Sequence, residues 1–93
     1  MDSSEWLRIA QQHFNSGRLP DAEHATREAL RVDPNNASAF LLLGKLASRG
    51  NDLNAALELM RRAQSLKPES AEILAGLGTV LFQAERLPEA QLV

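Results

Sequence analysis

The strongest constraint in this sequence is an internal repeat with a period of about 34 residues. Three short segments return at this spacing or at twice this spacing: Val32-Asp33-Pro34 as Leu66-Lys67-Pro68, Leu43-Gly44 as Leu77-Gly78, and residues 17–22 as residues 85–90. A unit of this length cannot bury its own apolar face, so it must stack on its neighbours. The period predicts one domain over residues 1–93, with units at 3–36 and 37–70 and a truncated unit at 71–93.

Each unit reads as two helices joined by a short turn. In the first unit, five residues follow the i, i+3, i+4, i+7, i+8 spacing of an amphipathic helix: Trp6, Ile9, Ala10, His13 and Phe14. Gly17 ends this helix, because glycine tolerates a left-handed conformation, and Pro20 suits the first turn of the next one. In the second unit, Gly50-Asn51-Asp52 makes the corresponding turn. No period-two alternation extends beyond a few residues, so no strand is expected.

Small residues recur at fixed places in the units. Gly44 and Gly78 fall in the middle of predicted helices, where each costs about 1 kcal/mol of helix propensity relative to alanine. Ala22, Ala56 and Ala90 recur in the second helices. We expect these small residues to face one another, so that the two helices of a unit pack closely.

In their 34-residue length, their two helices and their small residues, the units resemble the tetratricopeptide repeat. The pattern of that repeat is W-x2-L-G-x2-Y, then A-x3-F, then a late proline. The matching residues are Trp6-x2-Ile9-Ala10-x2-His13, Ala22-x3-Thr26-x2-Ala29 and Pro34; Phe40-x2-Leu43-Gly44-x2-Ala47, Ala56-x3-Met60-x2-Ala63 and Pro68; and Leu74-x2-Leu77-Gly78-x2-Leu81 with Ala90. The departures replace aromatic residues with His13, Thr26, Ala47 and Leu81, which predicts looser packing between helices.

The resemblance implies an all-α fold, a right-handed α-solenoid of antiparallel helix pairs. This chain would hold about 2.7 repeats, with five helices and a short sixth. In this family the first helices line a concave groove that binds a peptide or helix of a partner protein. The groove residues implied by the repeat register are Leu7, Gln11, Phe14, Asn15, Leu41, Lys45, Ser48, Arg49, Ala75, Thr79, Phe82 and Gln83.

One alternative concerns three of these groove residues. Phe14, Leu41 and Phe82 could instead extend the core, since large apolar side chains are more often buried than presented. Two known specialities of the family lack their residues here. The places that would grip a C-terminal carboxylate hold Leu7, Gln11, Leu42, Glu72 and Gly76, and the places of an asparagine ladder hold Arg8, Leu42 and Gly76.

Composition excludes several other classes. Ten Lys and Arg against 12 Asp and Glu give a net charge of −2, so no basic field favours nucleic acid. Without cysteine, no disulfide or zinc finger can form. The longest apolar run, Ala39–Leu43, is far short of the roughly 20 residues that span a bilayer, and the acidic start is no secretory signal. Cytoplasmic location is the default expectation.

Catalysis is not expected either, and no cofactor or metal is implied. His13 takes a core-facing place and His24 lies on another helix, and neither has a cysteine or close aspartate beside it. None of the serines has a base at nucleophile spacing.

The third unit is short of its second helix. We expect Ile73, Leu77 and Leu81 to be partly exposed, because solenoids normally end in a polar capping helix. Either the chain is an N-terminal fragment of a longer protein, for example of a larger enzyme such as a transferase, or it self-associates through this end.

Overall fold

The computed structural model describes residues 1–86, and these residues form five α-helices and no strand. The helices are α1 (Ser3–Asn15), α2 (Leu19–Val32), α3 (Ala37–Arg49), α4 (Leu53–Leu66) and α5 (Ala71–Arg86). The predicted five helices are confirmed. The predicted short sixth helix falls on residues 87–93, outside the described residues.

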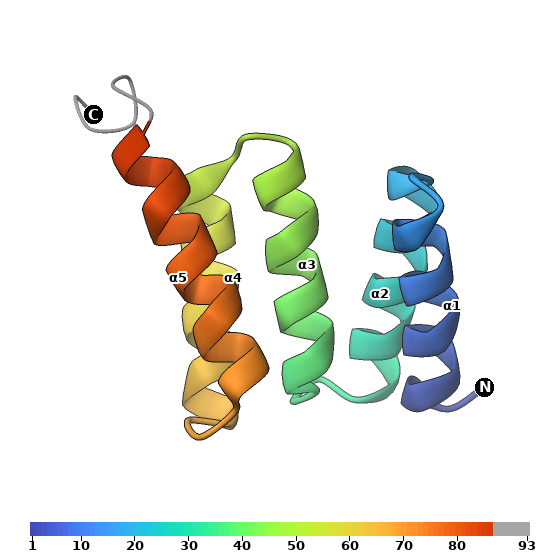
Figure 1. Ribbon diagram of the computed structural model, residues 1–93. Helices are drawn as coiled ribbons and strands as arrows, with labels where there is room; N and C mark the ends of the chain where they lie inside the picture. Colours follow the sequence, from blue (N-terminus) through green and yellow to red (C-terminus); the bar gives the residue numbers. More distant parts are fainter. Residues whose placement is uncertain (87–93) are drawn as a thin grey trace.

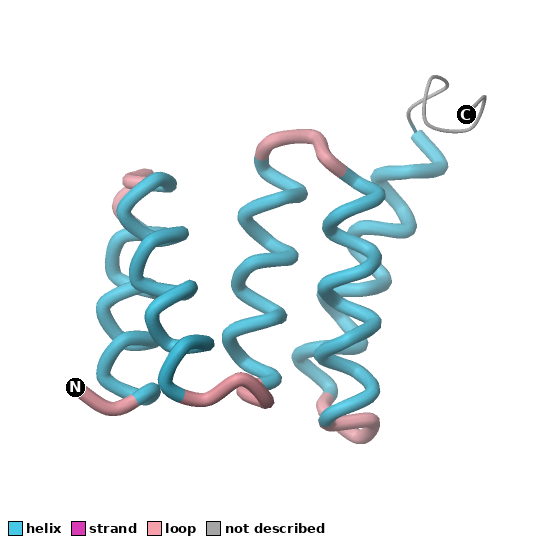
Figure 2. The backbone as a smooth tube through the Cα atoms, turned by 180° about the vertical axis from the view of Figure 1, so that it is seen from behind, coloured by secondary structure: helices cyan, strands magenta, loops and turns pink. Residues whose placement is uncertain are grey.

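The helices form antiparallel hairpins that stack side by side. α1 packs against α2, α3 against α4, and α5 against α4. α5 lies in front of α4 in Figure 1 and behind it in Figure 2, so α1, α3 and α5 make one layer and α2 and α4 the other. The fold is an all-α helical-repeat solenoid, as predicted. The exact unit boundaries remain a prediction.

Polar side chains start most of the helices. The carboxylate of Asp2 accepts from the backbone N–H of Glu5, and Asn36 and Asp52 cap α3 and α4 in the same way. The Ser70 hydroxyl accepts from the N–H of Ile73 at the start of α5. Each such cap stabilises a helix by about 1 kcal/mol. α2 has no side-chain cap and begins with Pro20 in its first turn instead.

The turns within the hairpins use one left-handed residue each, at equivalent places. Gly17 has φ +78°, and Asn51, one period later, has φ +62°. The left-handed residue of the second turn is therefore Asn51 rather than the neighbouring Gly50. Glu85 stands at the third equivalent place, and α5 continues through it to Arg86. Glutamate disfavours the left-handed conformation that ends α1 and α3, so α5 runs past their equivalent end at Gln83.

Alanine makes much of the core, and close helix packing follows. Ala10, Ala22, Ala29, Ala56 and Ala63 are fully buried. A Cβ added at Gly44 would lie 2.7 Å from Cγ of Met60, which confirms that α3 and α4 need a glycine there. Apart from the adjacent residues and the backbone of its own helix, no described atom lies within 4 Å of a Cβ added at Gly78, so the described residues show no close approach of another helix there. Its predicted partner, Ala90, lies outside the described residues.

The exposed end of the array differs in one respect from the sequence prediction. Leu81 is 42% exposed and Leu77 is partly buried, as expected. Ile73 is only 2% exposed, so its predicted exposure is wrong. The reason is that α5 turns this side chain toward α4, where it joins the core cluster that contains Met60 and Ala63.

Candidate functional site

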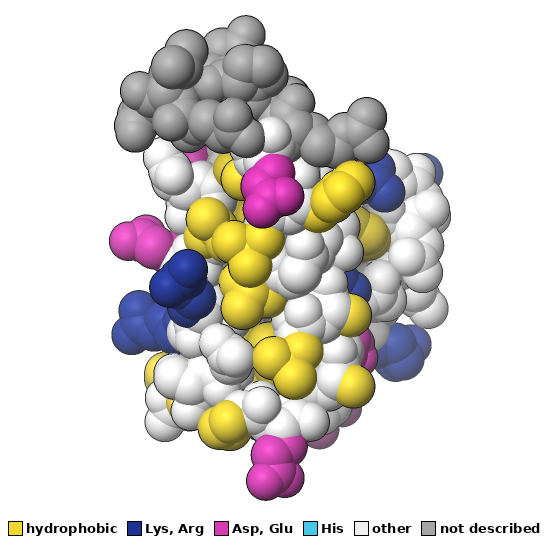
Figure 3. Space-filling model, turned by 60° about the vertical axis from the view of Figure 1, so that its left-hand side comes forward, with side chains coloured by type: hydrophobic (Ala, Val, Ile, Leu, Met, Phe, Trp, Pro, Cys, Tyr) yellow, Lys and Arg dark blue, Asp and Glu magenta, His cyan; other side chains and the backbone are white. Residues whose placement is uncertain are grey.

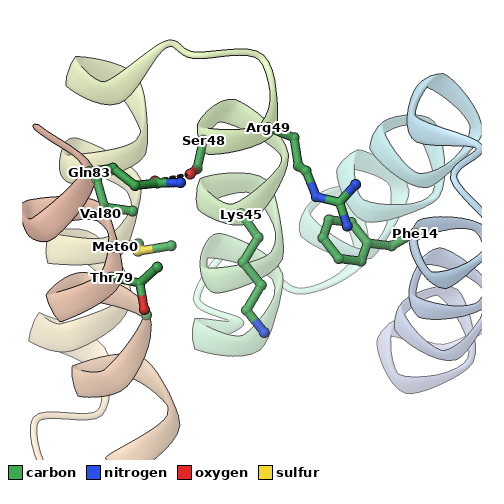
Figure 4. A pocket seen from close by; sticks show the side chains of 9 residues that line it. Phe14, Lys45, Ser48, Arg49, Met60, Thr79, Val80 and Gln83 are labelled. Atoms are coloured by element: carbon green, nitrogen blue, oxygen red, sulfur yellow. Dashed lines mark hydrogen bonds between the residues drawn. The ribbon is translucent and has the colours of Figure 1, made fainter. Parts of the chain in front are cut away.

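A hollow between α1, α3 and α5 is the candidate site (Figure 4). Its volume is about 380 Å³. Nine residues line it: Phe14 from α1, Lys45, Ser48 and Arg49 from α3, Met60 from α4, and Gly76, Thr79, Val80 and Gln83 from α5. We call this hollow the main pocket.

The floor of the main pocket is apolar. Met60 and Val80 are each 1% exposed and belong to the core cluster. Gly76 lets α5 come close to this floor, because a Cβ added there would lie 3.0 Å from Cδ1 of Leu41 and 3.5 Å from Met60. A thioether on an unbranched chain adapts to irregular neighbours, so Met60 gives the pocket a floor that can adjust.

The walls of the main pocket are polar and connect the helices. The Ser48 hydroxyl donates to the Gln83 carboxamide oxygen at 2.6 Å, which joins α3 to α5 (Figure 4). The guanidinium carbon of Arg49 lies 5.0 Å from the centre of the Phe14 ring, a cation–π contact that joins α3 to α1. These two contacts connect three of the four lining helices.

A smaller hollow of about 70 Å³ adjoins the main pocket at Lys45, which lines both. Its other lining residues are Leu7, Gln11, Ser38, Leu41, Leu42 and Glu72. Nζ of Lys45 lies 3.8 Å from Oε1 of Glu72, so a long, solvated ion pair joins α3 to α5 here. The two hollows together make a groove along α3, which we call the α3 groove.

The structure brings most of the twelve predicted groove residues together. Six line the main pocket: Phe14, Lys45, Ser48, Arg49, Thr79 and Gln83. Leu7, Gln11 and Leu41 line the smaller hollow, but Leu41 is only 3% exposed and belongs to the core, the alternative that the sequence left open for it. Asn15, Ala75 and Phe82 line neither hollow and are exposed, and Asn15 accepts a hydrogen bond from Gln11 at 3.1 Å.

Sequence reasoning missed the floor of the groove. Met60 and Val80 are not among the predicted groove residues, and Met60 comes from a second helix. Gly76 was considered only as a place of the missing carboxylate grip and the missing asparagine ladder. Met60 reaches the groove because Gly76 presents no side chain in front of it. One signal could have found this: Leu42 occupies the place of Gly76 one period earlier.

Little in the described residues points to catalysis. No group of three or more His, Asp and Glu side chains within residues 1–86 could hold a metal ion. His24 is exposed, and its ring meets that of Trp6 edge-on at 6.4 Å. The clear pKa shifts in this part of the chain lie on α2, where a hydrogen bond of 2.8 Å between Arg31 and Glu28 lowers the pKa of Glu28 and raises that of Arg31.

Comparison with known proteins decides the family. The model of the tetratricopeptide repeat matches residues 7–71 and, in a second overlapping placement, residues 41–92. The chain belongs to the tetratricopeptide repeat family. The repeats of this family are typically non-catalytic and mediate contacts between proteins. Among residues 1–86, no helix is both long and apolar enough to cross a membrane.

Relatives carry this tetratricopeptide repeat region within longer chains. The chain is 36% identical over 80 residues to the formate-dependent nitrite reductase complex subunit NrfG of Escherichia coli O157:H7, covering 84% of this chain and 40% of that protein. It is 32% identical over 74 residues to peroxisome biogenesis protein 5 of Arabidopsis thaliana, covering 80% of this chain and 10% of that protein. A mutant O-GlcNAc transferase of Thermobaculum terrenum superposes with a TM-score of 0.83 at 33% identity, covering 90% of this chain and 17% of that one. The chain thus spans less than half the length of each of these proteins.

Proposed function

We propose that this tetratricopeptide repeat chain is a non-catalytic interaction module that holds a segment of a partner protein in the α3 groove. The observation that carries the proposal is the main pocket, where three helices converge on an apolar floor within polar walls. Pockets of this kind, concave and apolar with a few placed polar groups, are typical binding sites. The general role of the family in protein contacts supports the proposal.

Four helices contribute to the groove, which makes it a property of the stacked array. The Ser48–Gln83 hydrogen bond and the Arg49–Phe14 contact preorganise its walls before any partner arrives. Preorganisation reduces the entropy lost on binding and so favours affinity. The groove could bind a partner segment in the same way if this region were the non-catalytic part of a larger enzyme.

The test uses a bulky side chain placed in the groove. Thr79 is exposed on α5 and lines the main pocket, so Thr79→Trp should fill the pocket without disturbing the core. Glu58→Trp is the matched control, because Glu58 is exposed on α4 in the other layer. We expect proteins captured by the wild-type chain to be retained by Glu58→Trp and lost with Thr79→Trp. Equal capture by both variants would place the interaction on another surface.

A second candidate, self-association, is favoured by the outward side of α5. Leu74 and Leu81 are 45% and 42% exposed, two turns apart on one side of the helix. Figure 3 shows a band of hydrophobic side chains on the side of the molecule where α4 and α5 lie. We expect sedimentation to show dimers that Leu81→Glu converts to monomers, with Glu58→Gln as the control. A wild-type monomer at high concentration would remove this candidate.

A further inference from the structure

We propose that the α3 groove selects an acidic partner segment in which an Asp or Glu side chain lies close in sequence to a large apolar side chain. The apolar side chain enters the main pocket over Met60 and Val80. The carboxylate of the partner replaces that of Glu72 in the ion pair with Lys45. This inference rests on the proposed function and names the chemistry of its partner.

The size and lining of the main pocket fit one large side chain. Its volume of about 380 Å³ is near the lower end of the usual range for ligand pockets, about 300–1,000 Å³, and is too small for a whole helix. The apolar floor is formed by Met60 and Val80, both buried. An apolar side chain placed there would remove its own surface from water, which is the main favourable term in such contacts.

The charges around the groove favour a carboxylate. Lys45 and Arg49 line the main pocket, and none of its nine lining residues is acidic. Arg49 places its guanidinium carbon 5.0 Å from the centre of the Phe14 ring and keeps its positive charge at the wall of the pocket. Although the chain as a whole carries a net charge of −2, this groove presents two cations.

The ion pair between Lys45 and Glu72 is suited to exchange. Its atoms lie 3.8 Å apart, and the Glu72 side chain is 73% exposed. Exposed pairs of this length contribute little free energy, so a partner carboxylate can replace Glu72 at small cost. Glu72 is the single carboxylate lining the α3 groove in the described part of the chain. It competes with the proposed ligand and keeps Lys45 occupied in the free protein.

The test uses defined peptides and amide chemical shifts of the labelled full chain. The probes are acetylated, amidated heptapeptides of Gly and Ser that hold Asp and Leu one, two or three positions apart. Matched peptides replace Asp with Lys, or Leu with Ala. We expect the best Asp–Leu peptide to shift the amides of Ser48, Gly76 and Thr79, and each replacement to weaken binding at least about fivefold.

The outcomes separate this inference from the proposed function. If Lys–Leu or Asp–Ala peptides shift the groove amides as strongly as Asp–Leu peptides, the acidic or apolar requirement is wrong while groove binding stands. If no peptide shifts groove amides at millimolar concentration, both the inference and the groove as a peptide site are contradicted.

Two variants test the exchange at Lys45 directly. Lys45→Gln should weaken binding of the Asp–Leu peptide about three- to fivefold, whereas Arg61→Gln on α4 should leave it unchanged. Glu72→Gln should strengthen binding about twofold, because the competing carboxylate is gone, and Glu69→Gln should have no effect. Circular dichroism checks that all four variants fold. Unchanged or weaker binding by Glu72→Gln would overturn the displacement of Glu72.

Discussion

Within residues 1–86, the array has two junctions between its repeats. The first lies between the two helix pairs, and the second lies between the second pair and α5. Equivalent positions at the two junctions hold different residues. At the first junction, three evenly spaced places on successive helices hold Ala10, Thr26 and Leu42. At the second junction, one period later, the same places hold Gly44, Met60 and Gly76. At the first junction the large side chain is Leu42, from the first helix of the following pair. At the second junction it is Met60, from the second helix of the preceding pair.

The consequence is visible in the packing. Thr26 is fully buried and satisfies its hydroxyl by donating to the Ala22 carbonyl oxygen at 2.6 Å, while Leu42 packs with Ala10 in one cluster. Met60 instead packs between two glycines, and the main pocket opens above it. One backbone plan therefore fills the space between helix pairs in two ways, with Leu42 from the following first helix or with Met60 from the preceding second helix.

A polar contrast accompanies the packing contrast. The Ser3 hydroxyl donates to the Ala29 carbonyl oxygen at 3.2 Å and accepts from the Asn36 amide at 2.5 Å, so hydrogen bonds join the first hairpin to α3. The equivalent residues of the second junction are Ala37, Ala63 and Ser70, and both alanines are buried in the apolar core. At these equivalent places, hydrogen bonds at the first junction correspond to apolar contact at the second, whose Ser48–Gln83 hydrogen bond lies elsewhere.

The largest expected effect comes from truncating the side chain that fills the second junction. Met60→Ala should lower the free energy of unfolding by about 2–4 kcal/mol, because it leaves a cavity between two glycines that cannot fill it. Thr26→Ala removes less volume and a satisfied hydroxyl, and should cost about 1 kcal/mol. Urea unfolding followed by circular dichroism measures both. If Thr26→Ala lowers the free energy of unfolding as much as Met60→Ala does, the side chain at this position contributes equally to the packing of both junctions.

Two glycine substitutions should change stability in opposite directions. Gly44→Ala places a Cβ 2.7 Å from Cγ of Met60 and should destabilise by about 1–3 kcal/mol. Gly78→Ala meets no described atom and should stabilise by about 0.5–1 kcal/mol through helix propensity. Thermal melts of the two variants against wild type give the signs. Destabilisation by Gly78→Ala would mean that this position, too, requires close packing.

The polar connection of the first junction should be worth less than the packing of the second. Ser3→Ala removes both hydrogen bonds of the Ser3 hydroxyl and should cost about 0.5–1.5 kcal/mol. Ser4→Ala is the matched control, because Ser4 is exposed and adjacent. Equal urea midpoints for the two variants would show that the connection contributes nothing.

The smallest effect concerns the ion pair between Glu28 and Arg31 on α2. The equivalent places on α4 hold Arg62 and Ser65, which cannot form such a pair. Arg31 lowers the pKa of Glu28 in the folded state, chiefly by a hydrogen bond. The stabilisation is therefore present above the unfolded-state pKa of Glu28 and is lost as pH falls through its folded-state pKa.

Glu28→Gln should accordingly reduce stability slightly at pH 7 and leave it unchanged well below the folded-state pKa of Glu28. Glu58→Gln serves as the control on α4, and urea unfolding at both pH values is the measurement. An equal loss at both pH values would show that the charge of Glu28 is not the cause.

Much of the fold followed from the period, since helix positions and turns are dictated by local chemistry that recurs from one unit to the next. Gly17 and the apolar stripe from Trp6 to Phe14 were sufficient for the first hairpin. Ile73 and Leu41 show where this reasoning stops. Both are buried in one core cluster with Met60, and Leu41 lies so near Gly76 of α5 that a Cβ there would be 3.0 Å from its Cδ1. Such contacts join residues that are distant in sequence.

The groove was predicted on its walls but not on its floor. Ser48, Arg49 and Gln83 lie on first helices, where the repeat register places groove residues directly. Met60 lies on a second helix and takes part only because a glycine stands in front of it. A register assigns faces to helices, but an opening between two helices depends on pairs of residues that are distant in sequence.

The contact between Trp6 and His24 has a practical consequence for experiments on this chain. Trp6 is the only tryptophan, and its ring meets one from α2, so its fluorescence reports on the first hairpin alone. Circular dichroism reports on all helices at once. Coincident transitions by the two signals would mean that the hairpins lose structure together, and a lag between them would give the order in which the array comes apart.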